Sequence, residues 1–156
     1  MSQSSVVHAS FTVSRLLPVP PGRAFQAFVD PALKRRWFAE SDQHAVEEFV
    51  SDPRVGGSER LRYRFNEGSP FAGLTIANQD TILDIVPESR LIWVSKMSFG
   101  ERDISVALIT AELSPAGDGT ELSLTFQGAF FEGADGPEIR EIGWRQLLEN
   151  LAGLLS

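Results

Sequence analysis

The sequence predicts an α+β fold in which an antiparallel sheet of seven strands wraps around one long helix near the C-terminal end. The first observation is the order of the patterns: a strand, two short helices, six further strands and a helix. The second is the short connections between consecutive strands, which make neighbouring strands antiparallel. The third is the apolar stripe of the last helix, which needs a large apolar partner. The simplest arrangement curls the sheet around that helix.

The first strand is expected over residues 7–17, where side chains alternate between two faces until several prolines interrupt the pattern. Pro21 then suits the first turn of a helix. Apolar side chains of this helix recur on one side, at Ala24, Phe25, Phe28 and Val29. Asp30 caps a second helix. The apolar residues of the second helix are Leu33, Trp37 and Phe38.

Six further strands are expected before the final helix. They cover residues 45–50, 58–65, 74–85, 91–97, 104–113 and 121–127. Residues 58–65 alternate most cleanly, with apolar and aromatic side chains on one face and arginines on the other. A loop over residues 128–136 follows. Its two large adjacent rings, Phe130 and Phe131, favour a gate or an interface contact.

Two alternations are possible for the strand over residues 74–85, and they place its acidic residues on opposite faces. We expect Leu83 and Ile85 to point inward, which places Asp80 and Asp84 in water and keeps two charges out of an apolar interior. The opposite alternation would bring Asp80 into the interior. Burial would then raise its pKa and favour an enzyme.

The final helix is expected over residues 136–155. Its apolar stripe consists of Ile139, Trp144, Leu147, Leu148, Leu151, Leu154 and Leu155. Polar residues such as Arg140 fall on the opposite side. Asp135 is placed to cap the free N–H groups of the first turn, and Pro137 suits that turn.

Charge and composition exclude several classes of partner. The formal net charge of −7 argues against nucleic acid or an anionic membrane. The absence of cysteine excludes a disulfide framework, and two histidines are too few for a metal centre. Residues 1–6, expected to be disordered or extended, lack the features of a signal peptide, and no apolar run approaches a membrane span. We expect a soluble, cytoplasmic protein.

No catalytic set is evident in the sequence. There is no G-x-S-x-G motif, and Gly117-Asp118-Gly119 is followed by Leu122 where a dinucleotide fingerprint requires glycine. His44 is interpreted as a surface residue. The basic run Lys34-Arg35-Arg36 is interpreted as a solvated helix face, with contact to an anion or a partner as the alternative. We therefore expect no catalytic residue, no metal and no cofactor.

Several local patterns follow one another along the chain. They are Ala24-Phe25-Gln26-Ala27-Phe28, Asp30-Pro31 leading to Trp37-Phe38, Val55-Gly56-Gly57, Val86-Pro87 leading to Leu91-Ile92-Trp93, Gly119-Thr120 and Gly143-Trp144. In these patterns the chain resembles the START-like (SRPBCC, helix-grip) superfamily, within it the group named after the activator of the Hsp90 ATPase. The resemblance covers nearly the whole chain and implies a single domain over residues 1–156. It also implies a cavity between the sheet and the last helix.

The excess of apolar rings, 11 Phe and 3 Trp beside one Tyr, favours an apolar ligand in such a cavity. The expected ligand-binding residues are Trp37, Phe38, Tyr63, Phe65, Trp93, Phe130, Phe131, Trp144 and Leu148. We expect binding of a small hydrophobic or amphipathic molecule without catalysis. We also expect a homodimer, because an antiparallel sheet leaves its edges available.

Two other functions remain open, because the superfamily includes carriers, receptors, cyclases, hydrolases and co-chaperone domains. A cyclase- or hydrolase-type enzyme would need an ionisable group inside the cavity. A chaperone-associated module of the stress response would need an exposed patch, around Trp37-Phe38 or Phe130-Phe131.

Overall fold

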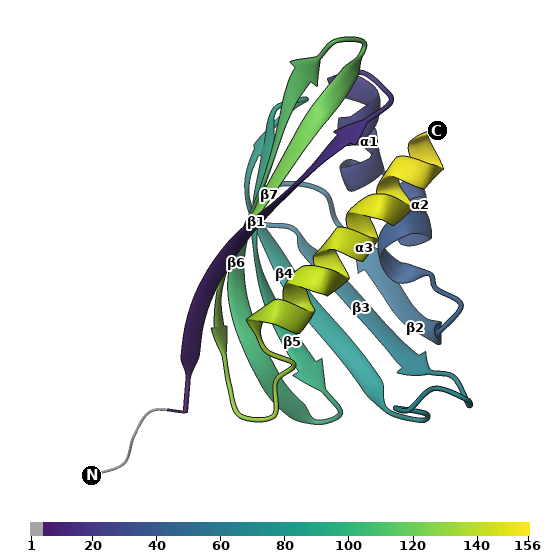
Figure 1. The fold of residues 1–156 in the computed structure, drawn as a ribbon, viewed down its shortest axis with the longest axis vertical. Helices are drawn as coiled ribbons and strands as arrows, with labels where there is room; N and C mark the ends of the chain where they lie inside the picture. Colours follow the sequence, from purple (N-terminus) through teal and green to yellow (C-terminus); the bar gives the residue numbers. More distant parts are fainter. Residues whose placement is uncertain (1–4) are drawn as a thin grey trace.

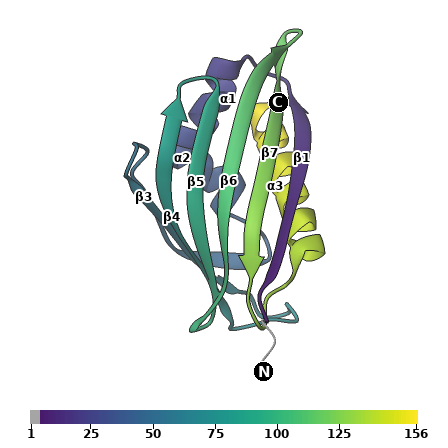
Figure 2. The same ribbon diagram turned by 90° about the vertical axis from the view of Figure 1, so that its left-hand side faces the viewer.

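Seven antiparallel strands form one sheet, in the order β1-β7-β6-β5-β4-β3-β2, in the computed structural model, which describes residues 5–156. The strands are β1 (Val7–Leu17), β2 (His44–Ser51), β3 (Ser58–Phe65), β4 (Thr75–Val86), β5 (Arg90–Phe99), β6 (Arg102–Ala116) and β7 (Gly119–Phe130). The sheet is curved, and the helices lie on its concave side (Figures 1 and 2). The predicted fold class is therefore confirmed. The expectation for residues 1–6 falls mainly on residues 1–4, which lie outside the described part of the chain.

Helix α3 (Pro137–Leu155) crosses the concave face, as predicted (Figure 1). Its buried residues are Arg140, Trp144, Leu148, Leu151, Ala152 and Leu155. Three details of the prediction are wrong, the first two being the faces of Ile139, which is 60% exposed, and Arg140, which is only 7% exposed. Asp135 pairs with the Arg140 guanidinium at 2.7 Å instead of capping the helix, and this ion pair makes burial of the arginine tolerable. Gly136 precedes the helix without a side-chain cap.

Three short helical segments between β1 and β2 pack beside α3. They are α1 (Pro21–Val29), α2 (Pro31–Lys34) and a π-helical turn, η1 (Arg35–Ala39). Asp30 caps α2 as predicted, since its Oδ1 accepts hydrogen bonds from the backbone N–H groups of Ala32 and Leu33. Lys34, the last residue of α2, is buried. The basic run is therefore not entirely a solvated face, contrary to our interpretation.

A bulge in β4 changes which side chains face the interior. The register against β5 shifts between Ile82 and Asp84, so Leu83 is an extra residue. Before the bulge Asp80 and Ile82 are buried, and after it Ile85 packs against the core. The prediction that Asp80 lies in water and Leu83 points inward is therefore wrong, whereas Asp84 does lie outside, in an exposed pair with an arginine. We predicted the two faces by counting alternate residues back from the turn after β4, and this count did not include the extra residue.

The hydrophobic core fills the concave face near α1 and the C-terminal end of α3. Leu17, Phe28, Leu122 and Leu155 are buried in this cluster. The cavity described below takes no lining residue from α1, and it adjoins this core, which shares residues such as Trp93 and Trp144 with the cavity walls. Within residues 5–156, no helix combines the length and apolar character needed to cross a membrane.

Candidate functional site: a cavity between the sheet and the last helix

A cavity of about 620 Å³ lies between the concave face of the sheet and the N-terminal half of α3. Its walls are mainly apolar and rich in aromatic rings, which include Phe38, Tyr63, Phe65, Trp93, Phe126 and Trp144. The Trp144 ring centroid lies 6.0 Å from that of Phe38 and 6.5 Å from that of Trp93. The volume falls within the range of roughly 300–1,000 Å³ that is typical of small-molecule pockets, which are mostly apolar with a few placed polar groups.

Five of the nine residues predicted to contact a ligand line this cavity. They are Phe38, Tyr63, Phe65, Trp93 and Trp144. The structure brings these five together, and their contact with a ligand stays a prediction. Trp37 and Leu148 lie in the solid core instead, with exposed fractions of 1% and 2%. The indole N–H of Trp37 donates to the backbone oxygen of Ala27 at 2.8 Å, so this ring joins η1 to α1.

Phe130 and Phe131 do not form a gate in a loop, contrary to the prediction. Strand β7 continues to Phe130, whose ring is buried 5.7 Å from the Phe126 ring. Phe131 follows the strand and is half-buried, and neither residue lines the cavity. Gly128 was taken to begin the loop, but it belongs to the strand. A Cβ there would lie 2.4 Å from the Phe126 ring, so the glycine permits close packing and does not make a turn.

The opening of the cavity carries exposed apolar side chains. Its exposed apolar lining residues come from the loop between β3 and β4 and from the first turn of α3. Phe71 and Ile139 line it with exposed fractions of 51% and 60%. The Phe71 ring contacts Phe65 at 5.6 Å and Phe99 at 6.2 Å between centroids. Exposed apolar side chains at an opening are typical of a binding site for an apolar molecule.

A buried charge cluster borders the cavity. Glu59, Asp80 and Ser95 lie opposite one another on β3, β4 and β5, with Asp80 in the middle. The Lys34 ammonium reaches this row from α2 and contacts the Glu59 carboxylate at 2.7 Å, with both side chains at most 8% exposed. The same ammonium lies 4.6 Å from the Phe38 ring centroid, over its face. The cluster therefore holds one cation between two acids on the inner side of the sheet.

Asp80 is the unusual member of this cluster. Burial raises the pKa of Asp80 to about 7, although Lys34 and the hydrogen bond from Ser95 act to lower it and Glu59 acts to raise it. One carboxyl oxygen, Oδ1, is buried without a hydrogen-bond partner among the described residues, and so is the amide oxygen of Asn78. Both residues line the cavity. Buried polar atoms without partners are rare in folded proteins and call for an explanation.

A second charged group lies near the mouth. Arg140 holds Asp135 through two hydrogen bonds of 2.7 and 2.8 Å, and donates a third to the Ser105 hydroxyl at 3.0 Å. Its guanidinium carbon also lies 5.1 Å from the Phe130 ring centroid and 5.6 Å from that of Phe126. The guanidinium N–H groups of Arg140 thus donate to other side chains of the protein.

His44 was expected at the surface, but it is half-buried and lines the cavity. Its ring stacks on Tyr63 at 3.7 Å between centroids, and its Nε2 lies 2.6 Å from the backbone oxygen of Ala39. Burial raises the pKa of Tyr63 to about 12, so its phenol stays protonated at neutral pH. Within residues 5–156, no three His, Cys, Asp or Glu side chains are grouped as metal ligands would be.

The predicted arrangement leaves Asp80 and Arg140 outside the cavity and does not include Asn78 in its lining. For Asn78 and Asp80 a signal was present, because Ile76 and Ile82 bracket them at the same parity and isoleucines favour the buried face. For Arg140 no comparable signal exists, since its inward orientation depends on the distant Ser105 and on a loop acid.

The comparisons with known proteins agree with this architecture. The family model described as activator of Hsp90 ATPase homolog 1-like protein matches residues 18–156. The chain belongs to this family. No curated protein matches the sequence. The match to the AHSA1 family confirms the resemblance that the local patterns indicated. The family supports a ligand-binding scaffold in general terms.

Solved structures of similar proteins extend over nearly the whole chain. A protein from Rhizobium loti is 43% identical, with a TM-score of 0.85, over 97% of this chain and 99% of its own. A protein from Rhizobium leguminosarum is 32% identical, with a TM-score of 0.90, over 99% of this chain and 98% of its own. An AHSA1-like protein from Aeromonas hydrophila is 18% identical, with a TM-score of 0.70, over 94% and 91%, and shows the fold alone.

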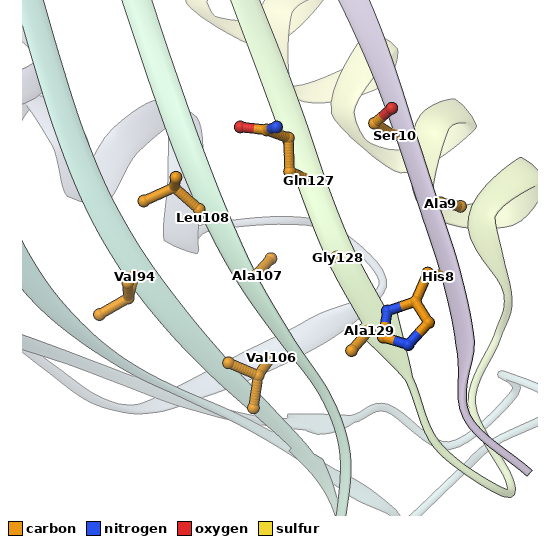
Figure 3. A pocket seen from close by; sticks show the side chains of 10 residues that line it. All are labelled: His8, Ala9, Ser10, Val94, Val106, Ala107, Leu108, Gln127, Gly128 and Ala129. Carbon is orange, nitrogen blue, oxygen red and sulfur yellow. The ribbon is translucent and has the colours of Figure 1, made fainter. Parts of the chain in front are cut away.

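The outer face of the AHSA1-family sheet carries a shallower depression of about 600 Å³ (Figure 3). Val94, Val106 and Leu108 border it on β5 and β6, and His8 borders it at the edge strand β1 (Figure 3). Small residues on β7, including Gly128 and Ala129, form its floor. It is a groove over a sheet face, open to solvent, and it has no buried charged group among its lining residues. The cavity between the sheet and α3 is more enclosed and is therefore the better candidate for a small-molecule site.

Proposed function

We propose that this AHSA1-family protein binds a small hydrophobic or amphipathic molecule in the cavity between the sheet and α3. The observation that carries the proposal is the partly enclosed volume of about 620 Å³, with exposed apolar side chains at its opening, aromatic rings in its walls and a few inward polar groups. The proposal includes action as a single cytoplasmic domain over residues 1–156. It requires no nucleic acid, membrane, metal or cofactor.

The neutral naphthalene dye prodan tests this proposal, because its emission rises and shifts to shorter wavelength in an apolar site. We expect saturable binding at micromolar concentration, with quenching of tryptophan emission from Trp93 and Trp144 in the cavity wall. Replacing Phe65, which lines the cavity, by glutamine removes apolar contact and adds a polar group. We expect Phe65→Gln to weaken dye binding about tenfold, since burial of a phenylalanine side chain contributes roughly 1.5–3 kcal/mol.

Phe49→Gln is the matched control. Phe49 is a half-buried phenylalanine on β2 that packs against the core and does not line the cavity. Its replacement should lower stability and leave the dye affinity within about twofold, because Phe49 has no side-chain surface in the cavity. Equal losses of affinity in the two variants, or no dye response in the wild type, would mean that the cavity is not the binding site.

An enzyme of the cyclase or hydrolase type is the second candidate, and the position of Asp80 favours it. Its carboxyl lines the cavity, and its pKa near 7 suits a group that exchanges a proton with a bound molecule near neutral pH. The fate of the ligand separates the two functions. A binding protein releases it chemically unchanged, whereas an enzyme releases a product.

The interaction module lacks the surface that the sequence suggested for it. Trp37, Phe38 and Phe130 are all buried, so no exposed aromatic patch forms around either pair of residues. A role in a chaperone-associated stress response would have to use another surface, and we do not propose one.

A homodimer remains part of the proposal. The sheet ends in two edge strands, β1 and β2, and the groove in Figure 3 adjoins the first of them. Edge strands present unpaired backbone groups that a second copy is able to use. We expect light scattering at micromolar concentration to give twice the mass of one chain, which is 17.2 kDa. A mass of one chain would refute the dimer and leave the cavity proposal intact.

A further inference from the structure

The two unpartnered acceptors in the cavity lie on one strand and face the same way. Asn78 and Asp80 are two residues apart on β4, so their side chains project on the same face, roughly 7 Å apart along the strand. Each has an oxygen buried without a hydrogen-bond partner among the described residues, and both line the cavity. Such an oxygen costs free energy until a donor reaches it. The pair therefore marks a place in the cavity where two buried acceptors lack hydrogen-bond donors.

The cations near this point are already engaged. Lys34 contacts Glu59 at 2.7 Å, and Arg140 makes three hydrogen bonds to Asp135 and Ser105. The Ser95 hydroxyl donates to Asp80 itself. Among the described lining residues the cavity therefore offers acceptors and neutral donors such as Tyr63, but no unpaired cation. A ligand whose inner end is a carboxylate would meet the Asp80 carboxyl without a compensating charge.

We propose that the ligand carries a hydroxyl group at its inner end, that this O–H donates a hydrogen bond to the Asp80 carboxyl with the Asn78 amide beside it, and that an apolar ring system fills the aromatic part of the cavity. This inference rests on the proposed ligand-binding function. It adds the class of molecule, an apolar alcohol or phenol in preference to a fatty or aromatic acid.

The aromatic walls fit such a molecule. Trp93 and Trp144 line the same cavity as Asp80, with 6.5 Å between their ring centroids, and the Phe65 and Phe71 rings, 5.6 Å apart, add further apolar surface. Above pH 7 the Asp80 carboxyl, with its pKa of about 7, is largely ionised. A hydrogen bond from a hydroxyl to a carboxylate is stronger than one between neutral groups.

Three naphthalene compounds that differ in one substituent test the inference at about pH 8: 2-naphthylmethanol, 2-methylnaphthalene and 2-naphthoate. Each is titrated against the prodan complex of the full chain. We expect the alcohol to bind at least as tightly as the methyl compound, although its hydroxyl must leave water, and the carboxylate to bind more than tenfold more weakly than either.

Asp80→Leu removes the acceptor, and we expect it to lower the affinity ratio of alcohol to methyl compound about tenfold, as for a lost hydrogen bond to a charged group. Asn78→Leu should lower the same affinity ratio about threefold. This variant replaces Asp80→Leu in the test if Asp80→Leu does not fold. Asp84→Leu is the matched control, because Asp84 lies on the outer face of the same strand in an exposed pair with Arg90. It should leave the ratio within twofold.

The outcomes separate this inference from the function on which it rests. If the methyl compound displaces prodan but the ratio is the same in wild type, Asp80→Leu and Asn78→Leu, the cavity binds ligands and the hydroxyl anchor is wrong. A ratio that falls equally in Asp84→Leu also overturns the anchor. If neither prodan nor any of the three compounds binds, the ligand-binding function itself fails, and the anchor with it.

Discussion

Replacing Lys34 by methionine should lower the free energy of unfolding by about 3–5 kcal/mol, because it leaves a buried carboxylate without its cation. The Lys34 ammonium contacts Glu59 at 2.7 Å, and both side chains are at most 8% exposed. Methionine has a similar shape and preserves packing against the Phe38 ring. The loss is therefore expected to come from the charge, since the variant keeps most of the apolar contact.

Urea unfolding near pH 7.5 measures this change, and a double variant isolates its cause. Lys34→Met combined with Glu59→Gln removes both charges, so it should recover most of the lost stability. Lys96→Met is the control, because Lys96 forms a pair with Asp103 in which both side chains are about half exposed. Exposed pairs contribute about 0–1 kcal/mol. A loss in Lys34→Met no larger than in Lys96→Met would show that the buried pair contributes little.

The stability of the protein should also depend on the protonation of Asp80. Its pKa is raised from the ordinary value of 3.8 to about 7 in the folded protein, so between these values the folded state holds a proton that the unfolded state releases. The contribution is fully present below about pH 4 and is lost as pH rises through about 7. A shift of this size corresponds to a loss on the order of 4 kcal/mol across that window.

Asp80→Asn removes the titration while keeping the size of the side chain. Relative to the wild type, the variant should gain stability as pH rises from about 4 to about 7, and the difference should become constant above pH 8. Asp84→Asn, on the outer face of β4, controls for the loss of one carboxylate from this strand. Urea unfolding at several pH values gives both curves. A wild-type minus Asp80→Asn difference that does not change with pH would contradict the assignment.

The sequence predicted the framework well because its signals are local. Strand alternation, the proline at the start of each helix and the Asp30 cap act within a few residues, and the structure contains each of them. The aromatic residues of the cavity were also predictable in part. Phe65 and Trp93 lie on strands with clear alternation, and both face inward.

The polar interior was not predictable in the same way, because it depends on partners far apart in the chain. Lys34 is inward because Glu59, 25 residues later, accepts its charge. Arg140 is inward because Ser105, 35 residues earlier, and a loop acid both accept from its guanidinium. A charged residue considered alone is assigned to water, and only the paired arrangement makes its burial favourable.

The extra residue in β4 has a consequence for how sequence changes would act on the interior. Leu83 separates two halves of one strand that are out of phase, so Asp80 from one half and Ile85 from the other both face the concave side. Removal of Leu83 would restore regular alternation and leave both residues inward, whereas the same strand paired without the bulge would turn one of them outward. Loss of this solvent-facing residue should therefore preserve the interior, and the local pairing of β4 with β5 decides which chemical groups the interior contains.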